Sequence, residues 1–254
     1  MAEQLVLERL CENLTRLRLA HLRESLPEMV KNAEADSWSY LHLLDTLFEE
    51  EVACKEQHRI ENSLKRAGLP YLKTLDEFDF AFQAGIDKRQ VSSLFDLTFI
   101  ERKENVLFLG PPGVGKTHLA VALAVKAAQA GHVIHFTTMA DLIYKLRIDR
   151  ETGRSGRGRR CYSSNLVVVD EVGYTPIDRE ECNLFYQFVA LRYEKASTII
   201  TSNKAFGEWS ELFHDPVIVT AILDRLLHHS AVVNIKGNSY RLKGKLPMEV
   251  TPAD

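Results

Sequence analysis

The residues best suited to chemistry form a glycine-rich segment in the middle of the chain, Gly110-Pro111-Pro112-Gly113-Val114-Gly115-Lys116-Thr117. This segment fits the pattern G-x-x-x-x-G-K-[ST] and lies between an apolar run and a helical run that starts at His118. Glycines let backbone N–H groups surround a phosphate, and the start of a helix adds a favourable field. Lys116 would contact the β- and γ-phosphates and Thr117 would ligate Mg²⁺. We expect a nucleoside triphosphate site that includes His118; the alternative is an ordinary glycine-rich turn.

Two adjacent carboxylates, Asp170 and Glu171, end a second apolar run. Asp170 would organise the ligands of the Mg²⁺ ion, and Glu171 would orient and polarise the water that attacks the γ-phosphate. The pair therefore indicates hydrolysis more than phosphate transfer to another acceptor. An apolar run that ends in Asp-Glu is common by chance, and its place after the glycine-rich segment is what makes it informative.

A third apolar run, residues 198–201, ends in Ser202 and Asn203. We expect its end beside the other two motifs, where Asn203 would hydrogen-bond the γ-phosphate or the attacking water. The alternative is that Ser202 and Asn203 only turn the chain.

These motifs belong to a part of the chain in which short apolar runs alternate with helical segments. Such alternation predicts an α/β fold with a parallel sheet between helices. Five strands are expected, at residues 105–109, 133–138, 166–169, 198–201 and 231–235.

The beginning of the chain has a different pattern. Apolar residues recur there at helical spacing, in the series Leu10, Leu14, Leu17, then Leu22, Leu26, Met29, then Leu41, Leu44, Phe48, Val52. Gly68 and Pro70 would end the last of these helices and start a connector. We therefore expect a small all-α domain at residues 1–72 and a nucleotide-binding domain at residues 73–254.

Composition limits the class of protein. A chain of 254 residues with 45% apolar residues suits a soluble globular protein, and a net charge of −3 gives no bulk support for nucleic-acid binding. No run approaches the roughly 18 to 20 apolar residues of a membrane span, so we expect a cytoplasmic protein without a membrane partner. The four cysteines form no C-x-x-C pair and suggest neither a zinc site nor a disulfide framework.

The three motifs in this order resemble the AAA+ ATPases, in the branch of initiators and helicase loaders that includes DnaC. The resemblance is closer to the IstB-like family, the ATP-dependent helpers of insertion-sequence transposases, and it covers essentially the full chain. The residues that carry it are 72–80, 170–174, 222–226 and 239–243. It implies an AAA+ P-loop core whose helical lid is truncated or absent.

The same resemblance implies a function. The protein would use ATP and Mg²⁺, form a homo-oligomer on target duplex DNA with little sequence specificity, and recruit and activate the transposase of its own element. ATP would sit between neighbouring subunits, and the helices of residues 1–72 would serve self-association or contact with the transposase.

Two arginines receive roles from the resemblance. Arg225 matches the arginine finger that an AAA+ subunit supplies to its neighbour, and Arg241 resembles the sensor-2 arginine that contacts nucleotide in its own subunit. A permanently charged guanidinium suits both roles, because it stabilises phosphate charge in the transition state. For each, the alternative is an arginine that faces solvent or DNA.

Residues 147–160 form a second basic feature, with an excess of four positive charges. A flexible segment rich in arginine and glycine suits contact with phosphate backbones without base reading. A solvated loop that binds nothing is the alternative. The predicted DNA contacts are Arg147, Arg150, Arg154, Arg157, Arg159 and Arg160.

Three other functions stay open at this point. A replicative-helicase loader would share the ATPase core and prefer single-stranded DNA. A non-hydrolysing scaffold would use ATP only to fix an oligomer. A small-molecule kinase would transfer phosphate to an acceptor other than water.

Overall fold

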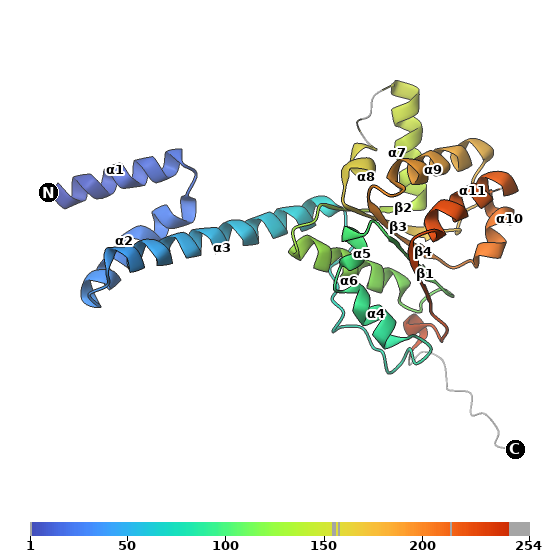
Figure 1. Cartoon of the computed structure of the whole chain (residues 1–254), viewed down its shortest axis with the longest axis horizontal. Coiled ribbons are helices and arrows are strands. Elements are labelled where there is room, and N and C mark those ends of the chain that lie inside the picture. Colours follow the sequence, from blue (N-terminus) through green and yellow to red (C-terminus); the bar gives the residue numbers. More distant parts are fainter. Residues whose placement is uncertain (1, 154–155, 157, 214, 244–254) are drawn as a thin grey trace, which may run out of the picture. The chain divides into compact units, whose positions relative to one another are not determined.

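The computed structural model describes residues 2–153, 156, 158–213 and 215–243 (Figure 1). The chain divides into two compact units, Met1–Asn62 and Ser63–Asp254. The functional boundary that we predict between residues 72 and 73 stays a prediction. Within the described ranges, no helix is both long and apolar enough to cross a membrane.

The N-terminal unit is helical. Its elements are α1 (Ala2–Arg16), α2 (Ala20–Ala35) and the first part of α3 (Tyr40–Ala67). The core of this unit is small and contains Leu22, Leu26, Met29 and Leu47. The buried carboxylate of Glu51 accepts a hydrogen bond of 2.7 Å from the Leu22 amide, which satisfies a free N–H group near the start of α2.

One apolar stripe of α3 lies outside this core. Each of its residues is at least half exposed, namely Leu41, Leu44, Phe48 and Val52. The predicted helix is present over these residues, but α3 buries a neighbouring face, which includes Leu47.

A five-stranded sheet with all strands parallel forms the centre of the C-terminal unit. Its strand order is β2-β3-β4-β1-β5. Figure 1 labels β2, β3, β4 and β1 in this order. Every predicted strand is present, which confirms the α/β class. The bounds are β1 (Asn105–Leu109), β2 (Ile134–Thr138), β3 (Leu166–Val172), β4 (Ser197–Ser202) and β5 (Ser230–Asn234).

Helices cover both faces of the sheet, because side chains of each strand alternate between two cores. In β1, Val106 and Phe108 pack with Leu119, whereas Leu107 packs with Phe185. The first core involves α4 (Lys88–Leu94), α5 (Thr98–Glu101) and α6 (Lys116–Gln129). The second involves α7 (Met139–Thr152), α8 (Arg159–Ser163), α9 (Arg179–Arg192), α10 (Trp209–Phe213) and α11 (Pro216–Leu227). Two short helices, η1 (Phe206–Glu208) and η2 (Tyr240–Leu242), complete the described elements.

The strand order decides which chain segments meet at the carboxyl edge of the sheet. Since β4 lies between β1 and β3, the end of β4 separates the glycine-rich segment after β1 from the carboxylates at the end of β3. In open parallel sheets ligands bind at this edge. An irregularity between Val169 and Val172 also interrupts the pairing of β3 with β4 there.

Candidate nucleotide-binding site

The P-loop, residues 110–117, connects β1 to α6. Lys116 is buried, and its Nζ donates hydrogen bonds to Gly110 O at 2.7 Å and to Pro111 O at 2.8 Å. Burial lowers the pKa of Lys116, and the negative charge of Asp170 opposes that shift. The ammonium group therefore lies within the loop whose N–H groups would surround a phosphate.

Gly115 occupies a position in the P-loop that requires glycine. Its φ is +99°, and a Cβ atom there would collide with the ring of Phe78. The Phe78 ring also packs edge-on against His118, with ring centroids 5.4 Å apart. A ring nitrogen of His118 lies 2.9 Å from Thr74 O. The connector before α4 thus covers one side of the P-loop.

Asp170 is buried at the end of β3 and accepts hydrogen bonds from two hydroxyl groups. One comes from Thr117, at 3.0 Å to Oδ1, and the other from Thr201 on β4. Carboxylate and hydroxyl oxygens are hard ligands of the kind that Mg²⁺ prefers. The donor set therefore fits the predicted ion, with Thr117 and Asp170 as the residues that would hold it.

Glu171 lies in the irregular part of β3 and has a φ of +63°, in the left-handed region. A non-glycine residue in this region is strained by about 1–3 kcal/mol, and such strain concentrates at functional sites. The Glu171 amide donates a hydrogen bond of 3.1 Å to Thr201 Oγ1, which holds the backbone in place. The side chain is exposed and lines the same cavity as Lys116 and Thr117. An exposed carboxylate beside the phosphate site is suited to accept a proton from water.

Asn203 follows β4 directly, and its Oδ1 atom is buried. No donor of the described residues lies within hydrogen-bonding distance of that atom, so an acceptor is left unused near the sheet edge. Asn203 does not line the cavity that contains Lys116, whereas Thr201 does. Sequence reasoning missed Thr201, although the polar end of the third apolar run was a signal for it.

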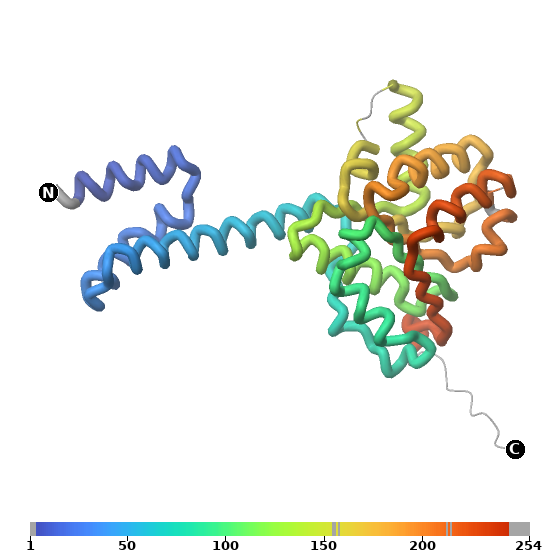
Figure 2. Tube along the Cα trace, viewed as in Figure 1, coloured from blue at the N-terminus to red at the C-terminus, as the bar shows by residue number. Residues whose placement is uncertain are grey.

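The cavity has a wall that the three motifs did not indicate. The connector between α3 and α4, residues 68–87, lies beside the segment after β5, residues 235–243, which we call the C-terminal segment (Figure 2). A bridge between Gly85 and Lys236 and a 2.7 Å ion pair between Lys243 and Asp79 join the two. Residues 72–80 were singled out above as part of the family resemblance. Their sequence did not predict that this part of the wall contacts the C-terminal segment. The wall residues are Tyr71, Glu77, Phe78, Asp79, Gln83, Tyr240 and Arg241.

The two arginines with roles implied by resemblance lie in different places. Arg241 is part of η2 and lines the cavity. Arg225 is on α11 and does not line it. Its Nη1 donates a hydrogen bond of 2.9 Å to Ala221 O, and its guanidinium lies 5.1 Å from the centroid of the Tyr186 ring. Within one chain, Arg241 is therefore the arginine of this pair at the nucleotide site.

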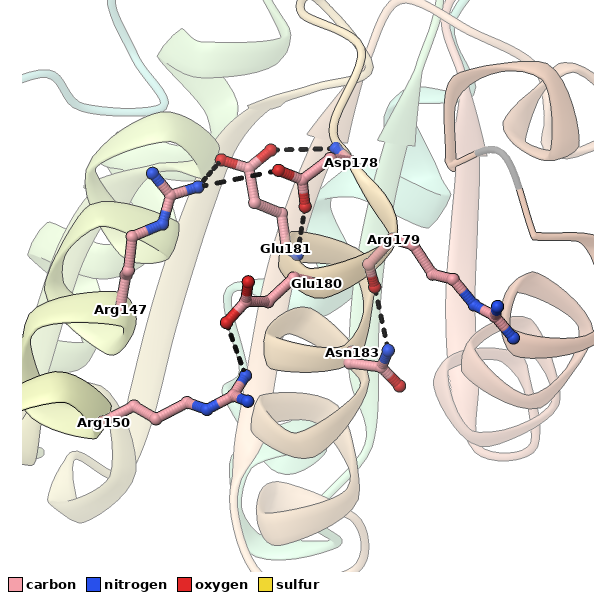
Figure 3. A network of polar contacts seen from close by, with 7 residues as sticks. All are labelled: Arg147, Arg150, Asp178, Arg179, Glu180, Glu181 and Asn183. Atoms are coloured by element: carbon pink, nitrogen blue, oxygen red, sulfur yellow. Dashed lines mark hydrogen bonds and ion pairs between the residues drawn. The ribbon is translucent and has the colours of Figure 1, made fainter.

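Two of the predicted DNA-binding arginines are paired with carboxylates at the start of α9 (Figure 3). Arg147 pairs with Glu181 and lies 4.0 Å from Asp178, and Arg150 pairs with Glu180 at 2.9 Å. These contacts join α7 to α9 and compensate part of the positive charge that the sequence places there.

Of the remaining four predicted DNA-binding arginines, the structure describes two. Arg159 is exposed at the start of α8, and Arg160 donates from Nη1 to Arg66 O at 3.0 Å. Arg154 and Arg157 lie outside the described residues.

Known proteins resemble this chain over most of its length. It matches the family model of the IstB-like ATP binding protein over residues 12–247. It is 48% identical over 233 residues to the ATP-binding protein of insertion sequence IS21 from Pseudomonas aeruginosa, covering 91% of this chain and 88% of that protein. It is 42% identical over 248 residues to the ATP-binding protein of insertion sequence IS5376 from Geobacillus stearothermophilus, covering 97% and 99%.

A solved structure has the same fold. AMPPCP-bound DnaA from Aquifex aeolicus is similar with a TM-score of 0.54 at 20% sequence identity, over 72% of this chain and 59% of the DnaA chain. This similarity confirms the AAA+ P-loop fold. The matched residues 12–247 include the P-loop, both carboxylates and both arginines. The chain therefore belongs to the family of IstB-like ATP-binding proteins associated with insertion sequences.

Proposed function

We propose that this protein is an Mg²⁺-dependent ATPase that assembles on target duplex DNA in the cytoplasm and recruits and activates the transposase of its insertion sequence. One observation supports the ATPase most directly. The hydroxyl groups of Thr117 and Thr201 meet the carboxylate of Asp170 at the cavity that Lys116 and Glu171 line.

Each residue of the site has its own role in the proposed hydrolysis of ATP. Lys116 and the P-loop amides bind the β- and γ-phosphates and offset their charge. Mg²⁺, held by Thr117 and Asp170, supplies charge neutralisation on the phosphates when it is bound. Glu171 accepts a proton from the attacking water, and Asn203 orients that water or donates from its side-chain N–H group to the γ-phosphate.

Arg225 acts on the nucleotide of a neighbouring subunit. Its position outside the cavity of its own chain supports this role, and Arg241 contacts the nucleotide of its own subunit. An arginine supplied by a neighbour couples turnover to assembly, because an isolated subunit lacks part of the charge that stabilises the transition state. A homo-oligomer with ATP at its interfaces follows from this arrangement.

DNA contact and transposase recruitment rest on the family and on surface charge. The relatives are ATP-binding proteins of insertion sequences, and Arg159 and Arg160 add exposed positive charge to α8. A ring of subunits repeats such charges, so that modest phosphate contacts add up to firm and salt-sensitive binding. The helices of residues 1–72 provide self-association or the contact with the transposase.

ATP hydrolysis with duplex DNA, with single-stranded DNA and without DNA tests this proposal. Stimulation by duplex DNA that is lost in Glu171→Gln and in Arg225→Ala supports it. Stimulation by single strands instead indicates a helicase loader, and phosphate found on an acceptor other than water indicates a kinase. ATP binding without turnover under all three conditions indicates a scaffold.

A further inference from the structure

Two turns at the amino edge of the sheet bring a carboxylate and two histidines together. Glu194 lies in the turn after α9, and His228 and His229 follow one another at the end of α11. One ligand atom of each side chain lies within 4.8 Å of those of the other two, and Nε2 of His229 is 3.9 Å from a carboxylate oxygen of Glu194. Among the residues that the structure describes, no other group of three His, Cys, Asp or Glu side chains has this spacing.

The backbone that carries the two histidines is fixed by hydrogen bonds. The His228 amide donates a hydrogen bond of 3.1 Å to Asp224 O, so His228 continues the last turn of α11. His229 O accepts a hydrogen bond of 2.8 Å from the amide of Asn105, the first residue of β1. The helices α9 and α11 pack against each other (Figure 1), which holds the turn of Glu194 beside the two histidines.

The three side chains are accessible from solvent. All of them are exposed, so an ion can reach them without a rearrangement of the fold. The His228 ring is oriented by Tyr193, whose hydroxyl oxygen lies 2.6 Å from Nδ1. Histidines that bind metal ions usually have such a hydrogen-bond partner at the second ring nitrogen. Asp224 lines the same surface hollow as His228 and adds negative charge beside the group.

Two imidazoles and a carboxylate form a donor set for a transition-metal ion. Imidazole nitrogen suits Zn²⁺, Ni²⁺ and Cu²⁺, whereas Mg²⁺ and Ca²⁺ prefer ligands that are all oxygen. Zn²⁺ sites with three protein ligands keep a fourth position for water. Nitrogen and oxygen ligands about 2.0–2.1 Å from one tetrahedral ion lie about 3.3 Å apart, so small side-chain rotations complete the site.

We propose that Glu194, His228 and His229 bind one divalent transition-metal ion of the Zn²⁺ class, with water completing the coordination. The ion ties the end of α9 to the end of α11 and stabilises the packing of these helices. The site lies at the amino edge of the sheet, where β1 and β5 begin, whereas the P-loop follows the carboxyl end of β1. It is therefore separate from the Mg²⁺ and the nucleotide of the proposed function, and neither proposal depends on the other.

Titration of the full chain with ZnCl₂ tests the site, without nucleotide and with Mg²⁺ in excess. Calorimetry should show one tightly bound Zn²⁺ ion per chain. Glu194→Gln and His229→Gln each remove one ligand, so each should weaken Zn²⁺ binding at least about tenfold. Both positions are exposed, and circular dichroism checks that the two variants fold.

A second pair of histidine and glutamate provides a matched control. Nε2 of His21 lies 3.4 Å from a carboxylate oxygen of Glu50, and within the described ranges the pair belongs to no group of three ligands. His21→Gln should therefore leave the dissociation constant of Zn²⁺ unchanged. X-ray absorption of the Zn²⁺ complex identifies the ligand atoms: nitrogen and oxygen at about 2.0–2.2 Å are expected, without sulfur at about 2.3 Å.

The tie between α9 and α11 has a separate readout. Zn²⁺ at 100 times its dissociation constant should raise the folding equilibrium constant of the C-terminal unit about 100-fold in urea unfolding, and far less in His229→Gln. The proposal is overturned if the full chain binds no Zn²⁺, if either ligand variant binds it as tightly as the unsubstituted protein, or if His21→Gln weakens it equally. Sulfur among the ligands, or Zn²⁺ binding that leaves the stability unchanged, would also overturn it.

Discussion

Thr201 on β4 contacts both carboxylate residues at the end of β3: its hydroxyl donates to Asp170 and accepts a 3.1 Å hydrogen bond from the Glu171 amide. One side chain thereby fixes the residue that would hold Mg²⁺ and the backbone of the residue that would activate water. The contact exists because β4 pairs with β3 on both sides of the irregularity, Ile200 with Val169 and Ser202 with Val172, which leaves Thr201 opposite Asp170 and Glu171.

Thr201→Val should lower turnover more than nucleotide affinity. Valine keeps the shape of threonine and leaves Asp170 with one fewer donor, a change that costs about 1–3 kcal/mol for a buried charged acceptor. We expect a fall in kcat of about tenfold or more with a smaller change in the dissociation constant of ATP. Thr201→Ser restores the hydroxyl and should recover most of kcat; equal losses in the two variants would contradict the assignment.

Gly115→Ala should abolish tight nucleotide binding. The left-handed backbone costs an alanine about 1–2 kcal/mol, and its Cβ would also displace the Phe78 ring from the P-loop. Gly207→Ala is the matched control, since no atom lies within 4 Å of the added Cβ. Calorimetric titration with ATP measures both. An unchanged dissociation constant in Gly115→Ala would contradict the structure, because it would show that the P-loop accommodates a Cβ atom at this position.

Mixing two inactive variants should restore ATP hydrolysis if Arg225 acts between subunits. Arg225→Ala retains Glu171, and Glu171→Gln retains Arg225, so a mixed interface can contain both groups. Random mixing makes about one interface in four competent, and we expect about that fraction of the activity.

Arg241→Ala is the control for this experiment. Arg241 lines the cavity of its own chain, so mixing with Glu171→Gln never places both groups at one site. Recovery of ATP hydrolysis in both mixtures, or in neither, would contradict the proposal that Arg225 acts on the neighbouring subunit and Arg241 on its own.

The stability of the protein should fall between pH 6.5 and pH 4 because of His135. This residue of β2 is 8% exposed, and among the described residues neither ring nitrogen has a hydrogen-bond partner. Burial, together with the positive charges of Lys145, Arg160 and Arg192, lowers its pKa from 6.5 to about 4. The unfolded chain therefore binds a proton in this range and the native chain does not, so acid favours unfolding.

The loss should reach about 2 kcal/mol at pH 5 and vanish above pH 7. Urea unfolding at pH 7.5 and pH 5 measures it, and His135→Leu should flatten this part of the pH dependence. His132→Gln, at a half-buried position just before β2, controls for the loss of a histidine. A pH dependence that is unchanged in His135→Leu would assign the acid sensitivity to other groups.

The sequence by itself determined the features that depend on local chemistry. Phosphate binding needs glycines, a lysine and a hydroxyl at fixed spacing, so the sequence of residues 110–117 is enough to predict a phosphate site there. Continuous apolar runs are typical of strands buried on both faces, so all five strands were predicted. The candidate roles of Asp170, Glu171 and Asn203 were predicted from their positions at the ends of apolar runs.

Tertiary structure decided which of these ends meet and what covers them. The pairing of β4 between β1 and β3 brings Thr201 to Asp170, and the bridge from Gly85 to Lys236 brings Gln83 to the C-terminal segment. Such contacts join residues far apart in the chain, and neither partner carries a local pattern that marks the other. The apolar stripe of α3 shows the same limit, because helical spacing defines a face and only packing decides whether that face is buried.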